Sequence, residues 1–244
     1  MPTHMSSLLD FGPIYNQTGS ISQIEYATKC ADNGSTIIAI KSKKGLVIAI
    51  EKPKESCLIK NKENKRLVHL SNKIYTCFSG LLTDGQFISA GIKRQIINFV
   101  KLNEEISAKA VKGFISEYVS IFTRYFNTRP VGCNFITGMM NDGNYHILLT
   151  DCTSKTHFYK ACAIGKGSVR ARTELEKNNY DDMEVIDLAE NVVRIMYRCH
   201  DPIKDKEFDI ELCYMNESTG YKMVEANETE LNVLVEKYKH LSVD

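Results

Sequence analysis

Residues 165–168 combine two glycines, a lysine and a serine, the residue types of a phosphate-binding loop. Such a loop needs the spacing G-x-x-x-x-G-K-[ST], so that backbone amides surround the phosphates, and the sequence GKGS lacks it. We therefore predict a turn that starts a helix. His146, His157 and His200 could ligate a metal, but none has a partner at ligand spacing. They are interpreted as solvated or core histidines, and no metal site is expected.

The eight cysteines are scattered along the chain, without a C-x-x-C pair or a closely spaced Cys/His pair. Several lie in apolar stretches, which predicts free buried thiols in a reducing compartment and no cofactor. The cysteines are Cys30, Cys57, Cys77, Cys133, Cys152, Cys162, Cys199 and Cys213.

The charge balance argues against several classes of partner. Lys and Arg total 31 and Asp and Glu total 30, whereas nucleic-acid-binding domains usually carry a strong basic excess. The basic runs at 41–44 and 60–66 are interpreted as solvated turns. The N-terminus lacks the pattern of a secretory signal, and no stretch approaches the roughly 20 apolar residues of a membrane span. We expect a protein of the cytoplasm and nucleus that binds neither nucleic acid nor membrane.

Two hairpins follow a first helix that should begin near Ser20. Ser20 and Gln23 have the spacing of a capping box, in which each side chain satisfies a backbone amide of the other residue. Apolar strands are predicted at 35–42 and 46–51, and a second pair at 66–70 and 73–80. Because the first pair is almost continuously apolar, both of its faces should be covered.

The hydrophobic period then changes from two to 3.6, which predicts long amphipathic helices at 87–102 and 106–126. The remaining predicted elements are strands at 133–138, 145–150 and 157–164, helices at 168–177 and 183–199, a strand at 208–214 and a helix at 228–241. This order favours an α+β fold, a four-layer αββα sandwich of two antiparallel sheets with helices outside. No linker divides the chain, so residues 15–244 should form one domain after an N-terminal tail, 1–14.

The stretch at 15–27, YNQTGSISQIEYA, resembles the amino-terminal signature of proteasome alpha subunits, F-S-P-x-G-R-x-x-Q-V-E-Y-A. Gly19, Gln23, Glu25 and Tyr26 match it, Tyr15 takes the phenylalanine position, and Gln17 replaces the proline. The resemblance continues in register to about residue 215, through blocks at 33–36, 79–84, 129–132, 163–167, 174–177 and 204–212. The blocks at 162–166 and 204–208 are most similar to the alpha-seven group, named alpha type-3 in vertebrates.

The resemblance implies the αββα fold of N-terminal nucleophile hydrolases and a place in a seven-membered outer ring stacked on a ring of beta subunits. Catalytic beta subunits use an N-terminal threonine whose own amine is the base. Ser35 takes the aligned position here, and Glu51 and Arg66 fall near the positions of the catalytic carboxylate and lysine. Because a helix precedes Ser35, we expect a non-catalytic subunit. The alternatives are an active hydrolase of the same fold and a free-standing protein-binding module.

The resemblance also implies that the 1–14 tail takes part in gating and that activators dock between alpha subunits. Leu8 and Leu9 stand where a tyrosine-aspartate pair is expected, with Asp10 one residue away, so only Tyr26 of the gate residues remains. Arg66, with Lys65 beside it, is expected to pair with the terminal carboxylate of an activator. The implied partners are neighbouring alpha subunits, the beta ring, and the C-termini of the regulatory particle or other activators, in ubiquitin-dependent protein degradation.

Overall fold

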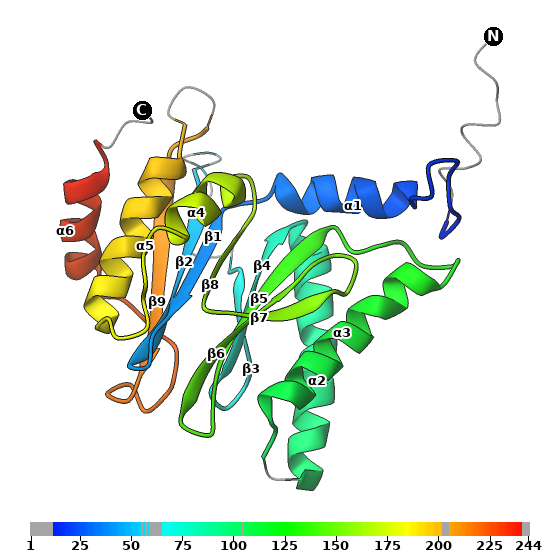
Figure 1. Ribbon diagram of the computed structural model, residues 1–244, viewed down its shortest axis with the longest axis horizontal. Helices are drawn as coiled ribbons and strands as arrows, with labels where there is room; N and C mark the ends of the chain where they lie inside the picture. The colour runs from blue at the N-terminus through cyan, green and yellow to red at the C-terminus, as the bar shows by residue number, and fades with distance from the viewer. Residues whose placement is uncertain are drawn as a thin grey trace.

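The computed structural model describes residues 12–54, 65–103, 105–201 and 205–240, together with Ser56 and Leu58. Two five-stranded sheets lie face to face in these ranges, and helices cover their outer faces (Figure 1). Every strand pair is antiparallel. The predicted α+β class and four-layer αββα arrangement are confirmed.

The first sheet has the strand order β10-β9-β2-β1-β8. Its strands come from both ends of the chain, so the sheet forms only when the last third of the chain packs beside the first hairpin. Their bounds are β1 Ile37–Lys41, β2 Gly45–Pro53, β8 Ala161–Ile164, β9 Phe208–Asn216 and β10 Val224–Glu225.

The second sheet has the order β3-β4-β5-β6-β7 and follows the chain as a meander. Its long insertion between β4 and β5 holds two helices, which pack on its outer face (Figure 1). The bounds are β3 Leu67–Ser71, β4 Ile74–Gly80, β5 Cys133–Asn141, β6 Asn144–Thr150 and β7 Thr156–Tyr159.

Alternation along β1 explains why its sequence is continuously apolar. Ile37 and Ala39 belong to the cluster between the two sheets, whereas Ile38 and Ile40 belong to the cluster under the helices of the first sheet. All four side chains are fully buried. The strand is therefore covered on both faces, as the sequence predicts.

The helices are α1 Ser22–Asp32, α2 Leu82–Asn103, α3 Ala108–Arg124, α4 Ser168–Leu175, α5 Val185–Cys199 and α6 Glu228–Tyr238. The α2–α3 pair covers the second sheet, and α4, α5 and α6 cover the first (Figure 1). α1 lies across the ends of the sandwich, against β4 and β5. No helix among the described residues is long and apolar enough to cross a membrane.

The single strand predicted at 157–164 is wrong, because the chain changes sheets there. β7 pairs with β6 in the second sheet, whereas β8 pairs with β1 in the first. Lys160 lies at the bend between them, and its carbonyl accepts a hydrogen bond from the Lys41 amide at 3.0 Å. The short strand β10 was also not predicted. Both errors arise because pairing partners, rather than local sequence, decide where these short strands begin and end.

The capping box predicted at Ser20 is wrong as well. α1 begins at Ser22, its N-cap is Ile21, and no side chain forms a capping hydrogen bond there. Ser20 instead accepts a hydrogen bond from the Asn16 side chain at 2.8 Å. The Ser20 hydroxyl therefore belongs to the hydrogen bonds of the turn before the helix and does not cap the helix.

Candidate functional site

The start of β1 is enclosed by neighbouring backbone. Ser35 and Thr36 are only 7% and 4% exposed. The Ser79 hydroxyl donates to the Ser35 carbonyl oxygen at 2.6 Å, and the Lys166 amide donates to the Gly34 carbonyl oxygen at 3.0 Å. The chain runs without a break from α1 through Gly34 into β1. The nitrogen of Ser35 is therefore a peptide amide, which cannot act as a base.

Glu51, which is buried, connects this strand start to a partly buried ion network. Its Oε2 accepts a hydrogen bond from the Thr36 amide at 2.7 Å, and its Oε1 lies 2.8 Å from Lys166 Nζ. Lys166 Nζ also lies 3.3 Å from Asp205 Oδ1. The Glu51 side chain is 3% exposed, so its charge needs these partners to remain stable in the interior.

Contacts within this network shift the pKa values of Lys166 and Asp205 in the direction opposite to the effect of burial. Burial opposes the charge on Lys166, but the hydrogen bond and charge of Glu51, together with Asp205, raise its pKa above the usual value. Burial likewise opposes ionisation of Asp205. The hydrogen bond from the Asp201 amide and the charge of Lys166 outweigh it, so the Asp205 pKa is lowered. Lys166 and Asp205 therefore both carry their charge at neutral pH.

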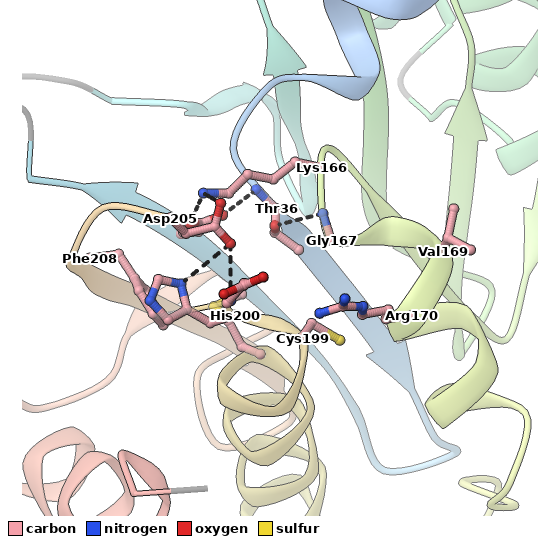
Figure 2. Close-up of a pocket in the computed structure, with 12 residues that line it drawn as sticks. Thr36, Lys166, Gly167, Val169, Arg170, Cys199, His200, Asp205 and Phe208 are labelled. Carbon is pink, nitrogen blue, oxygen red and sulfur yellow. Dashed lines mark hydrogen bonds and ion pairs between the residues drawn. The ribbon is translucent and has the colours of Figure 1, made fainter. Parts of the chain in front are cut away.

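A cavity of about 320 Å³ surrounds this network, between the first sheet and the ends of α4 and α5 (Figure 2). His200 lies at the C-cap of α5, with its ring centroid 4.6 Å from that of Phe208 and its Nδ1 3.8 Å from Asp205 Oδ2. The described part of the chain holds no group of three or more His, Cys, Asp or Glu residues suited to a metal ion.

The residues aligned with a catalytic triad do not share one cavity. Ser35 and Arg66 line a second cavity, also of about 320 Å³, at the end of the sandwich. Glu51 lines the cavity of Figure 2, and Lys166 lines both. The carboxylate oxygens of Glu51 lie beside the Thr36 amide and Lys166 Nζ, and Glu51 does not line the cavity that Ser35 and Arg66 share.

Arg66 is held at the rim of the second cavity. Its Nη1 donates to the Gly80 carbonyl oxygen at 3.1 Å, and its guanidinium carbon lies 5.9 Å from the centroid of the Phe78 ring. Lys65 beside it is exposed. A guanidinium presents its N–H donors in a planar fork, a geometry that matches a carboxylate. The run 59–64 that precedes these residues lies outside the described residues.

Asn16 organises the turn that precedes α1, and sequence reasoning did not single it out. Its side-chain oxygen accepts hydrogen bonds from the backbone amides of Thr18 and Ser20, each at 3.0 Å. The Gly19 amide donates to the Asn16 carbonyl at 3.0 Å, and Gly19 has a φ of 80°, which glycine adopts without strain. An asparagine four residues before a serine is a weak signal in sequence, because many asparagines occupy unrelated turns.

Most of the predicted signature residues have exposed side chains, whereas Gln23 is half-buried. Tyr15 is 70% exposed and Tyr26 is 47% exposed, and Gln17 and Glu25 are also exposed. Lys29 Nζ lies 5.9 Å from the Tyr26 ring centroid. Four of the six predicted signature residues therefore present side chains on the outer surface of α1 and of the turn before it, where another chain could contact them.

Gln23 is half-buried and lines a hollow between the start of α1 and the end of α3, beside Phe126. The gate itself stays a prediction, because three of its residues lie outside the described ranges: Leu8, Leu9 and Asp10.

A salt bridge fixes the loop after α3. Arg129 donates to both carboxylate oxygens of Asp84, at 2.6 and 2.7 Å, and the Gly132 amide donates to Asp84 Oδ2 at 3.0 Å. Burial opposes ionisation of Asp84, but these hydrogen bonds outweigh it, so its pKa lies below the usual value. The contact joins α2 to the loop between α3 and β5.

Comparison with known proteins decides the family. The model of the proteasome subunit family matches residues 31–215, from the end of α1 to the end of β9. A protein of Encephalitozoon cuniculi described as probable proteasome subunit alpha type-7 is 39% identical, over 98% of this chain and 99% of its own length. The chain belongs to the alpha subunits of the 20S proteasome.

Other relatives support the predicted group within this family. Proteasome subunit alpha type-3 of Dictyostelium discoideum is 30% identical over 84% of each chain. Probable proteasome subunit alpha type-7 of Saccharomyces cerevisiae is 29% identical over 85% of this chain and 74% of its own length. The names alpha type-7 and alpha type-3 agree with the group that the blocks at 162–166 and 204–208 predict.

The ion network was the other part of the site that sequence reasoning missed. Lys166 and Asp205 each lie in a block that resembles proteasome alpha subunits, but nothing in their spacing indicates that they meet. Glu51 was compared with a catalytic carboxylate, although in the structure its partners are Lys166 and the Thr36 amide. Contacts between segments so far apart follow only from the packing of β2, β8 and α5.

Proposed function

We propose that this alpha subunit is a non-catalytic structural and gating component of the outer proteasome ring, which controls the admission of substrates and docks activators. The observation that carries the proposal is the unbroken chain from α1 into β1, where Ser35 is 7% exposed and has an amide nitrogen. A hydroxyl nucleophile of this class needs a free amine beside it. The enclosed strand start therefore serves as a scaffold.

The intact mass of the subunit in purified particles tests the non-catalytic role. We expect a species that retains α1 and forms no covalent adduct with a threonine-directed proteasome inhibitor, while catalytic beta subunits in the same sample serve as the positive control. A mature species starting at Ser35 that carries the inhibitor would instead establish the active hydrolase.

The proposed partners are neighbouring alpha subunits and the beta ring, in the cytoplasm and nucleus. The exposed signature residues, among them Tyr15, Gln17 and Tyr26, support a surface that meets other chains. Size-exclusion chromatography of native extract, followed by immunodetection, tests assembly. Recovery of the chain only at its monomer mass of 27.7 kDa would favour the free-standing module.

Activator docking at Arg66 is the finer part of the proposal. Arg66 lines an open cavity, and its orientation by the Gly80 carbonyl and the Phe78 ring lowers the entropy lost when a carboxylate binds. We expect Arg66→Glu to weaken capture of an activator by reconstituted core particles. Lys44→Glu is the matched control, because Lys44 is an exposed basic residue in the β1–β2 turn. Equal capture by both variants would contradict the assignment.

A further inference from the structure

Asn16 is bonded through both its backbone and its side chain to the turn that leads into α1. Its amide donates to the Ser20 carbonyl oxygen at 2.7 Å. Its side-chain oxygen accepts from the Thr18 hydroxyl at 2.7 Å, as well as from the Thr18 and Ser20 amides. Its side-chain nitrogen donates to the hydroxyls of Ser20, at 2.8 Å, and of Ser22, at 3.5 Å. One half-buried side chain therefore closes this turn and joins it to the first residue of α1.

The other residues of the turn constrain it little. Gln17 lacks the ring that fixes φ in a proline, and its side chain is exposed. Thr18 is exposed as well. A Cβ built on Gly19 would meet nothing within 4 Å, so the turn is not packed against the domain at that point. The hydrogen bonds of Asn16, rather than a rigid ring or close packing, therefore hold the turn.

The segment ahead of the turn has a second fixed point. Gly12 and Pro13 line the hollow of about 400 Å³ beside the end of α3. Gly12 has a φ of 73°, and a Cβ built on it would lie 2.5 Å from the Phe126 ring. Figure 1 shows this segment as a loop at the start of α1. Because the loop is held at Gly12 and at Asn16, the turn sets the direction in which the chain passes from the tail into the domain.

We infer that Asn16 is a positioning residue for the N-terminal tail: its side chain holds the turn that directs the tail into its resting, closed-gate position. The inference rests on the proposed gating function. Asn16 acts through the direction of the chain ahead of it and touches no substrate. Water can replace surface hydrogen bonds of this kind, so the turn can open and re-form while α1 stays folded. The helix itself is held by other contacts, since Ala27 and Ala31 are buried.

The test uses assembled core particles without activator that carry variants of this subunit. One readout is hydrolysis of a fluorogenic peptide, and the other is hydrogen exchange of the 12–32 segment, measured by mass spectrometry. Asn16→Ala removes every side-chain contact, whereas Asn16→Asp keeps the oxygen acceptors and loses only the donor. Asn179→Ala is the matched control, because the Asn179 side chain accepts from the Asp181 amide at 3.2 Å in an exposed turn between α4 and α5. A particle whose subunit lacks residues 2–11 reports the full effect of the tail.

Loss of one hydrogen bond shifts an equilibrium by about two- to tenfold. Asn16→Ala should therefore speed exchange of the turn amides by at least about twofold and leave exchange within α1 unchanged. Peptide hydrolysis should rise by about twofold or more, toward the rate of the tail-deleted particle. Asn16→Asp should restore both readouts to near the parental values, and Asn179→Ala should change neither.

The tail-deleted particle separates the inference from the proposed function. If the deletion raises hydrolysis but Asn16→Ala does not, the tail gates and only the role of Asn16 is wrong. Unchanged exchange of the turn amides in Asn16→Ala would also overturn that role, and faster exchange throughout α1 would show that Asn16 merely stabilises the helix. If the deletion itself leaves hydrolysis unchanged, gating by this tail is wrong, and the inference fails with it.

Discussion

Replacement of Gly165 by alanine tests whether the start of β1 is as tightly enclosed as the structure indicates. Gly165 has a φ of 88°, and a Cβ built on it would lie 2.2 Å from the Ser35 carbonyl oxygen. Gly19 is the matched control, because its φ of 80° is similar but a Cβ there would meet nothing within 4 Å. The pair separates the cost of backbone conformation from the cost of the close approach.

The expected losses follow from these two terms. A positive φ costs an alanine roughly 1–2 kcal/mol at either position. At Gly165 the Cβ would sit about 1 Å inside ordinary contact distance of a backbone oxygen, which cannot rotate away as a side chain can. Overpacking of this kind adds about 1–3 kcal/mol. We therefore expect losses of about 1–2 kcal/mol for Gly19→Ala and about 2–5 kcal/mol for Gly165→Ala.

Urea unfolding of the full-length chain, followed by circular dichroism, measures both variants. With an m-value of about 2 kcal/mol/M, the midpoint of Gly165→Ala should lie about 0.5–1.5 M below that of Gly19→Ala. The m-values should match, since both folded states bury the same surface. Midpoints within about 0.2 M of each other would refute the close packing of the 165–167 turn against Ser35.

Three further measurements test other contacts. Asp84→Asn should lose about 1–2 kcal/mol at pH 7, a modest value because Arg129 is mostly exposed. The Asp84 pKa is depressed in the folded state, so its contribution is present above an unfolded pKa of about 3.9 and is lost as pH falls through the lower pKa of the folded state. The difference between the urea midpoints of parent and variant should therefore shrink as the pH is lowered through the acid range. Ser107→Ala should lose about 1 kcal/mol in thermal unfolding, because the Ser107 hydroxyl caps α3; an unchanged melting temperature would exclude that role. A double-mutant cycle of Glu51→Gln and Lys166→Met should give a coupling energy of about 1–3 kcal/mol in urea, and additive losses would contradict the ion pair.

Regular elements could be predicted wherever local pattern decides them. The helices predicted at 87–102 and 106–126 correspond to α2 and α3, because an amphipathic stripe of this length has one stable conformation against a sheet. The continuous apolar run of β1 predicted burial on both faces. Local pattern did not predict the change of sheet within 157–164, because the same apolar character suits a strand in either sheet. It also predicted a capping box at Ser20, although the Ser20 hydroxyl accepts a hydrogen bond from Asn16 and forms no helix cap.

The sequence by itself determined the layered α+β fold, the family signature and the helix ahead of Ser35, since each depends on residue order or on periodicity within one segment. Only the tertiary structure decided that Glu51 joins Lys166 and Asp205 rather than a nucleophile, and that Lys166 borders two cavities. The physical reason is that the position of an ion pair depends on side chains from β2, the β8–α4 turn and the loop after α5. Those segments meet only when the first sheet has closed, and no local pattern records which charges will then face one another.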